Sequence, residues 1–175
     1  MTAKEATVDD RAGAVVIGVG NVFRRDDGVG WALIEALRGH PAGVRLPKGT
    51  VLRESAGDPA QLIELWAHAD RAVVVDACFP AAACPGRVHR WCPPPGEAPP
   101  PAAGRHSTHG LGLVHALHLA DALGRRPACL VVYAVEGADR SLGQGLTPAV
   151  AGAVHPLAER IAEDLASHTR DRRGP

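Results

Sequence analysis

Residues 14–40, AVVIGVGNVFRRDDGVGWALIEALRGH, decide the fold class of this 175-residue chain. They begin with a short apolar run, 14–20, which is typical of a strand buried on both faces. They end with a helical pattern, 30–40, whose large apolar side chains share one face. That face carries Trp31, Ile34 and Leu37. A buried strand that leads through a glycine-rich loop into a helix predicts an α/β unit with a parallel sheet.

The same alternation continues towards the end of the chain. Further strands are expected at 50–55, 71–77, 86–91 and 128–135, and further helices at 58–69, 108–123 and 147–168. Asp58 followed by Pro59, and Thr147 followed by Pro148, are typical helix starts. We therefore expect an α/β three-layer sandwich, with a mostly parallel twisted sheet and helices on both faces.

The length of the chain fits a single domain, 1–175, with a core at about 14–166 and flexible tails at 1–12 and 169–175. The proline-rich segment 92–107 cannot form a β-ladder, because proline has no N–H donor. We expect a loop there that can move when a substrate docks.

Composition argues against several classes of partner. Lys plus Arg and Asp plus Glu balance at 19 each, which favours neither nucleic acid nor an anionic membrane. No apolar run approaches the ~20 residues of a membrane helix, and the polar start lacks the apolar region of a signal peptide. The four cysteines show no metal-finger spacing. We therefore expect a cytoplasmic protein with reduced thiols.

Three ionisable residues fall where the carboxyl ends of strands are expected to meet. Asp27 follows the first strand, Asp76 ends the run VVVD, and His109 opens the helix after the proline-rich loop. Ligands of open parallel sheets bind at this edge. Two carboxylates and an imidazole offer oxygen and nitrogen donors to a divalent cation and neutralise its charge. A purely structural interpretation also stands: Asp26 or Asp27 caps the helix, Asp76 caps a turn, and His109 faces solvent.

The glycine-rich loop also suggests a nucleotide site, which we find less favoured. GVGNVF begins like the dinucleotide fingerprint, but Phe23 stands where the third glycine belongs. Glu54 lies too far along the chain to be the usual ribose-binding acid. Asp26 and Asp27 would repel a pyrophosphate. The loop glycines instead predict a close approach of the backbone to some other bound group.

Four motifs together resemble the [NiFe]-hydrogenase maturation endopeptidases. They are GVGNVFRRDDGVG (18–30), VVVDA (73–77), STHGLGL (107–113) and GQGLTPAV (143–150), whose order and separations agree over about residues 14–166. The resemblance implies a twisted sheet between helices and a cytoplasmic protease. It also implies that the protease removes a C-terminal extension from the hydrogenase large-subunit precursor after nickel insertion.

The resemblance also implies the site residues and the metal. Asp27, Asp76 and His109 match the positions with which the family contacts metal, and they are the expected catalytic and metal-binding set. Some members have Glu where Asp27 stands. The nickel is carried by the substrate, held by its cysteine thiolates, and other divalent cations can occupy the site in the isolated protein. We expect a monomer whose partner is the large-subunit precursor.

Several points stay open at the level of sequence. The nucleophile is expected to be water, polarised either by the metal or by a carboxylate. The acid and histidine set either performs hydrolysis or only recognises the metal. Arg24 and Arg25 either face the C-terminal segment of the substrate or belong to a solvated loop. The alternative functions are a non-catalytic nickel-sensing or chaperone module and a nucleotide-binding α/β domain.

Overall fold

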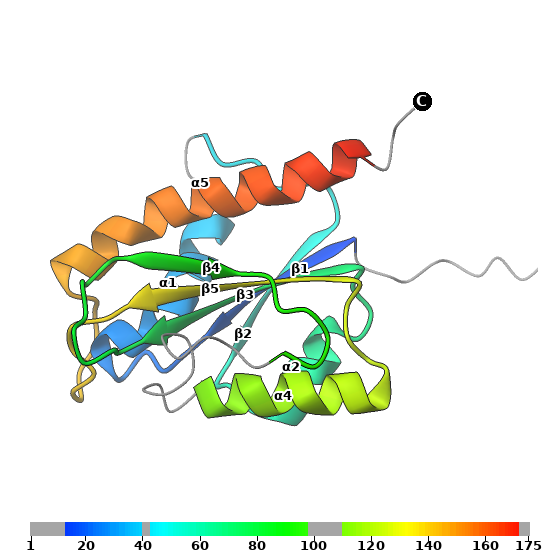
Figure 1. Ribbon diagram of the computed structural model, residues 1–175. Helices are drawn as coiled ribbons and strands as arrows, with labels where there is room; N and C mark the ends of the chain where they lie inside the picture. The colour runs from blue at the N-terminus through cyan, green and yellow to red at the C-terminus, as the bar shows by residue number, and fades with distance from the viewer. Residues whose placement is uncertain (1–12, 40–42, 98–109, 172–175) are drawn as a thin grey trace, which may run out of the picture.

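The computed structural model describes residues 13–39, 43–97 and 110–171, and these form a five-stranded sheet between two layers of helices (Figure 1). The strands are β1 (Ala14–Val19), β2 (Thr50–Ser55), β3 (Arg71–Cys78), β4 (Val88–Trp91) and β5 (Cys129–Glu136). Their order across the sheet is β2-β1-β3-β5-β4. All neighbouring pairs are parallel except β4 and β5, which are antiparallel. The mostly parallel sheet that the sequence predicts is therefore confirmed.

Helices cover both faces of the sheet, as expected. They are α1 (Val29–Arg38), α2 (Pro59–Trp66), α4 (Gly110–Leu123) and α5 (Pro148–Asp171). A 3-10 turn, η1 (Arg25–Gly28), lies directly before α1. Figure 1 shows α1 and α5 on one face and α2 and α4 on the other. Two apolar clusters fill the spaces between these layers. Alternate residues of each central strand enter opposite clusters, which explains the continuous apolar runs in the sequence.

One face of α1 differs from its prediction. Ile34 and Leu37 are buried as expected, but the third large side chain of the buried face is Leu33. Trp31 is only half-buried and its indole N–H donates to the backbone oxygen of Ser55 in β2. The indole ring is amphipathic, so it lies at the border of the core with its N–H satisfied.

The expected helix starts are present. The carboxylate of Asp58 accepts a hydrogen bond from the backbone N–H of Gln61 at 2.8 Å, and Pro59 is the first residue of α2. Pro148 is the first residue of α5, and the carbonyl of Thr147 accepts the first helical bond, from Ala151. The amino ends of α2 and α5 therefore lie directly after the loops that follow β2 and β5.

The structure describes the first part of the proline-rich loop, residues 92–97. The described residues 92–97 are tied to the region around α4: the N–H of Gly96 donates to Asp121, and the Arg126 guanidinium donates to the carbonyl of Pro93. The rest of the loop, 98–107, lies outside the described residues. Among the described helices, none is both long enough and apolar enough to cross a membrane.

Candidate functional site

Two of the three expected site residues lie at the same edge of the sheet. Asp27 belongs to η1, directly after the carboxyl end of β1, and Asp76 lies near the carboxyl end of β3. β1 and β3 are neighbours in the sheet, and η1 packs against β3. Asp27 is 2% exposed and Asp76 is 4% exposed. Two carboxylates from separate segments are therefore buried at one end of the sheet, a costly arrangement that needs compensating partners.

The third expected residue, His109, lies outside the described residues, immediately before α4. Within 13–39, 43–97 and 110–171, no group of three or more His, Cys, Asp or Glu side chains is placed to hold a metal ion. The expected metal set of Asp27, Asp76 and His109 therefore stays a prediction. One oxygen of Asp76 accepts a hydrogen bond from the N–H of Ala77 at 2.8 Å, which fixes the direction of the carboxylate.

Asp26 has a different role from the helix cap considered for it. The N-cap of α1 is Gly28, which has no side chain, so the Asp26 carboxylate does not occupy the N-cap position. Asp26 is fully buried, and its carboxylate accepts four hydrogen bonds from the loop between β5 and α5. The donors are the backbone N–H groups of Ala138, Asp139 and Thr147 and the hydroxyl of Thr147, at 2.7–3.0 Å. The interpretation of Asp26 as a cap is wrong, because the carboxylate joins η1 to the start of α5.

The glycines of the first motif are needed by the protein itself. A Cβ on Gly18 would lie 2.1 Å from the carbonyl oxygen of Gly30, and one on Gly30 would lie 2.3 Å from the oxygen of Val19. The first turn of α1 therefore rests directly on β1. Gly20 has φ of +149°, and a Cβ there would lie 1.9 Å from the oxygen of Asp27. These three positions bring chain segments together, rather than a ligand close to the backbone.

A further buried carboxylate at this edge was missed. Glu136 ends β5 and is 3% exposed. Its carboxylate accepts a hydrogen bond from the N–H of Cys84 and lies 2.6 Å from Nε2 of His89. Burial alone would raise the pKa of Glu136, but the bonds from Cys84 and His89, with Arg87 nearby, hold that pKa below its usual range. Its position at a strand end is the same signal that indicated Asp76.

Cys78 lies beside these carboxylates, and its surroundings disfavour the thiolate form. Burial, together with the negative charges of Glu136 and Asp76, raises the pKa of the Cys78 thiol to about 12. A thiol with such a pKa is almost entirely protonated at neutral pH. The candidate site therefore offers carboxylates rather than a thiolate for chemistry.

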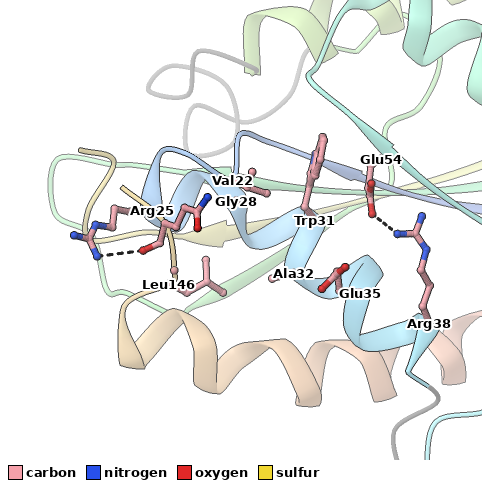
Figure 2. A pocket seen from close by; sticks show the side chains of 11 residues that line it. Val22, Arg25, Gly28, Trp31, Ala32, Glu35, Arg38, Glu54 and Leu146 are labelled. Atoms are coloured by element: carbon pink, nitrogen blue, oxygen red, sulfur yellow. Dashed lines mark hydrogen bonds and ion pairs between the residues drawn. The ribbon is translucent and has the colours of Figure 1, made fainter. Parts of the chain in front are cut away.

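A pocket of about 460 Å³ adjoins η1 on the side of α1. Figure 2 shows Trp31 in its middle, with Arg25 and Leu146 towards one end and the ion pair between Arg38 and Glu54 at the other. Glu54, considered above as a ribose-binding acid, is thus paired with an arginine of α1. Gly28, the residue after Asp27, also lines the pocket.

A family model described as hydrogenase maturation protease (HycI) matches residues 50–164, well over half of the chain. The chain belongs to the hydrogenase maturation protease family. Membership makes the protein a hydrolase of the endopeptidase class, as the resemblance implied, rather than a nucleotide-binding domain. Among curated proteins, no sequence matches the chain significantly.

Solved structures of hydrogenase maturation proteases share the fold over most of the chain. The hydrogenase maturating endopeptidase HybD from E. coli is 25% identical, with 89% of this chain and 93% of that chain covered and a TM-score of 0.75. The [NiFe] hydrogenase maturation protease HybD from Thermococcus kodakarensis is 25% identical, with 87% and 98% covered and a TM-score of 0.65. The resemblance inferred from the four motifs is confirmed.

Proposed function

We propose that this protease removes a C-terminal extension from a [NiFe]-hydrogenase large-subunit precursor after nickel insertion, and that it recognises the bound nickel. One observation carries the proposal: in a chain of this family, Asp27 and Asp76 are buried together at the carboxyl edge of neighbouring strands. His109, immediately before α4, completes the proposed set. The free cysteines, of which Cys84 and Cys92 are exposed, fit a reducing compartment, and we place the reaction in the cytoplasm.

In this proposal the nickel belongs to the substrate. The precursor holds it through cysteine thiolates, and Asp27, Asp76 and His109 occupy coordination positions that the thiolates leave open. Carboxylate and imidazole ligands then hold the precursor with its scissile bond at the edge of the sheet, so that recognition and positioning are one event. Water attacks the scissile carbonyl, activated by the metal or by one of the carboxylates.

The role of the three residues is tested by incubating the protein with a nickel-loaded precursor and measuring the precursor's C-terminus by intact mass. We expect Asp76→Ala, Asp76→Asn and His109→Ala each to abolish cleavage. Asp27→Glu should keep part of the activity, because the family resemblance implies that either acid serves. Asp58→Asn is the matched control, because it removes an exposed carboxylate but keeps an equally good helix cap. Full activity of Asp76→Ala would contradict the proposed role of Asp76.

The role of nickel is tested with a nickel-free precursor, which we expect to remain uncut. The isolated protease should bind nickel only weakly in a calorimetric titration, because three ligands leave the coordination incomplete. Efficient cleavage of the nickel-free precursor would exclude recognition through the metal. Binding of the nickel-loaded precursor without any cleavage would instead support a non-catalytic nickel-sensing module.

A further inference from the structure

Two loops beside the candidate site are joined into one surface, which we call the ledge (residues 22–25 and 141–144). The N–H of Gly143 donates to the carbonyl of Phe23 at 2.9 Å, and the N–H of Arg25 donates to the carbonyl of Gly143 at 3.0 Å. These bonds form a parallel bridge between Arg24 and Gly143. The ledge therefore combines the loop after β1 with the loop after β5.

The ledge carries two exposed large apolar side chains, one on each of its loops. In the parallel register, Phe23 lies opposite Leu142, since each precedes a residue of the bridge. Phe23 is 60% exposed and Leu142 is 79% exposed. Neither contributes to the two apolar clusters of the core. Exposed apolar side chains on neighbouring loops become part of a protein interaction site when a partner covers them.

Exposed arginines lie on or next to both loops of the ledge. Arg24 and Arg25 follow Phe23 directly, and both are exposed, as is Arg140 on the other loop. Arg25 lies 4.0 Å from the carboxylate of Asp139, a separation at which an exposed ion pair is weak. A cationic surface around an apolar centre is complementary to an apolar patch with acidic side chains around it.

The pocket beside η1 opens next to the ledge. Arg25 and Gln144 belong to both, and Arg25 donates to the carbonyl of Gln144 at 3.3 Å (Figure 2). The pocket also contains the half-buried faces of Trp31 and Leu146. Its volume of about 460 Å³ is large enough for an anchoring side chain of a partner.

The ledge is held in place before any partner arrives. The four hydrogen bonds to Asp26 join η1 to residues 138–147, which carry half of the ledge. Arg25 has φ of +49°, a conformation that is strained for a residue other than glycine. A surface that is ordered in advance loses less conformational entropy on binding.

We propose that the ledge and the adjoining pocket form the docking surface for the large-subunit precursor. The precursor presents an apolar patch to Phe23 and Leu142, inserts an apolar side chain between Trp31 and Leu146, and pairs acidic side chains with Arg24. Since Asp27 lies two residues beyond Arg25 in the chain, docking here brings the precursor to the candidate site. This inference rests on the proposed function, because it names where the substrate of that reaction binds.

The experiment measures kcat and KM for cleavage of the nickel-loaded precursor, and Kd by a binding titration. The double variant Phe23→Asp/Leu142→Asp should raise KM and Kd about tenfold or more and leave kcat within about twofold. Its matched control is Leu119→Asp/Leu123→Asp on α4, where the side chains are 42% and 55% exposed. The control should stay within about twofold of wild type.

A charge variant tests the second part of the surface. Arg24→Glu should raise KM severalfold at low salt, and the difference from wild type should shrink at high salt, because exposed charges are screened. Arg45→Glu is the control. Arg45 is also exposed, but it lies before the amino end of β2, whereas the ledge follows the carboxyl ends of β1 and β5. Thermal melting establishes that each variant is folded. If the Phe23→Asp/Leu142→Asp protein does not fold, the double variant Phe23→Ala/Leu142→Ala is used in its place.

The outcomes separate docking from catalysis. Equal KM and Kd for ledge and control variants would overturn the docking surface while leaving the protease function intact. A wild-type protein that binds the precursor through the ledge but never cleaves it would overturn the protease function alone. A dimer of this chain in sedimentation velocity that the ledge variants dissociate would overturn the inference, since a second copy would then be the occupant.

Discussion

Asp26 and Asp27 are adjacent in the sequence and both are buried, yet they are held by different parts of the molecule. The carboxylate of Asp26 receives all four of its hydrogen bonds from residues 138–147. Asp27 lies at the edge of the sheet where η1 packs against β3. The first carboxylate therefore holds the turn that presents the second.

Asp26→Ala should destabilise the protein by about 3 kcal/mol, because it leaves three part-buried backbone N–H groups and a hydroxyl without their acceptor. Asp26→Asn should also destabilise it, since one of the acceptor oxygens becomes a donor. Urea unfolding measures both. Asp58→Ala, which removes an exposed helix cap, is the reference at about 1 kcal/mol. A loss for Asp26→Ala no greater than that of the reference would contradict the role assigned here.

The sequence places Asp27 and Asp76 at one edge of the sheet because both follow apolar runs that end there in a parallel sheet, and the structure confirms that position. The role of Asp26 could not be found in this way, because its partner Thr147 is 121 positions away and no local pattern connects them. Glu136 could have been found, since it ends the apolar run 129–135 just as Asp76 ends an earlier one. Position relative to a strand end is visible in a sequence, whereas a hydrogen-bond partner across the fold is not.

At the scale of elements, the contact between β1 and the first turn of α1 has no space for side chains. Gly30→Ala should destabilise the protein by about 3 kcal/mol, because its Cβ would lie 2.6 Å from the backbone oxygen of Val75 as well as against Val19. Gly152→Ala in α5 is the control, since nothing lies within 4 Å of the added Cβ. That change should stabilise the helix by up to about 1 kcal/mol. Thermal unfolding distinguishes the two, and similar melting temperatures would contradict the close packing.

Asp164 connects α5 to two strands and should make stability depend on pH. It accepts hydrogen bonds from the hydroxyl of Tyr133 at 2.6 Å and from the guanidinium of Arg90 at 2.8 Å. Burial would raise the pKa of Asp164, but these two donors outweigh it and hold the pKa below its usual value of 3.8. Because the folded pKa is the lower one, this stabilisation is present above the unfolded pKa and is lost as pH falls through the folded pKa.

Urea unfolding as a function of pH measures that contribution. The wild-type protein should lose stability on acidification below about pH 4. Asp164→Asn should be less stable than wild type at neutral pH, and its stability should fall less steeply over the acidic range. Parallel pH profiles for the two proteins would show that the carboxylate of Asp164 makes no such contribution.

The elements were the most predictable level of this structure. Strand β2 has the predicted bounds, 50–55, and β3 extends the predicted 71–77 by one residue. Continuous apolar runs mark such strands clearly because both faces are covered. The face of α1 was less predictable, because the half-buried Trp31 obeys the helical period but lies at the rim of the core. The antiparallel direction of β4 left no signal in its four residues.

At the scale of the whole molecule, the four thiols should differ sharply in reactivity. Cys84 and Cys92 are exposed, Cys129 is partly buried, and Cys78 is buried with its pKa raised to about 12. Iodoacetamide at neutral pH should modify Cys84 and Cys92 first and leave Cys78 unmodified until the protein unfolds. Peptide mass spectrometry measures the order in which the four cysteines are alkylated. The protein alkylated at Cys84 and Cys92 should retain cleavage of the nickel-loaded precursor, and modification of Cys78 in the folded protein at a rate similar to theirs would contradict its burial.

The hydrogen bonds of Asp26 also bear on the order of folding during synthesis. The segment that supplies its partners ends 121 residues after Asp26, at Thr147, whereas β1 finds β2 and β3 within far fewer positions. A nascent chain that has emerged only as far as β3 can pair strands, but it carries a carboxylate whose donors have not yet been made. Loop closure over such a distance comes late, because its entropy cost must be met before the contact forms. The turn that carries Asp27 is therefore expected to become ordered only after the chain has been synthesised through the start of α5, and under the role proposed for Asp27 an unfinished chain lacks an ordered site.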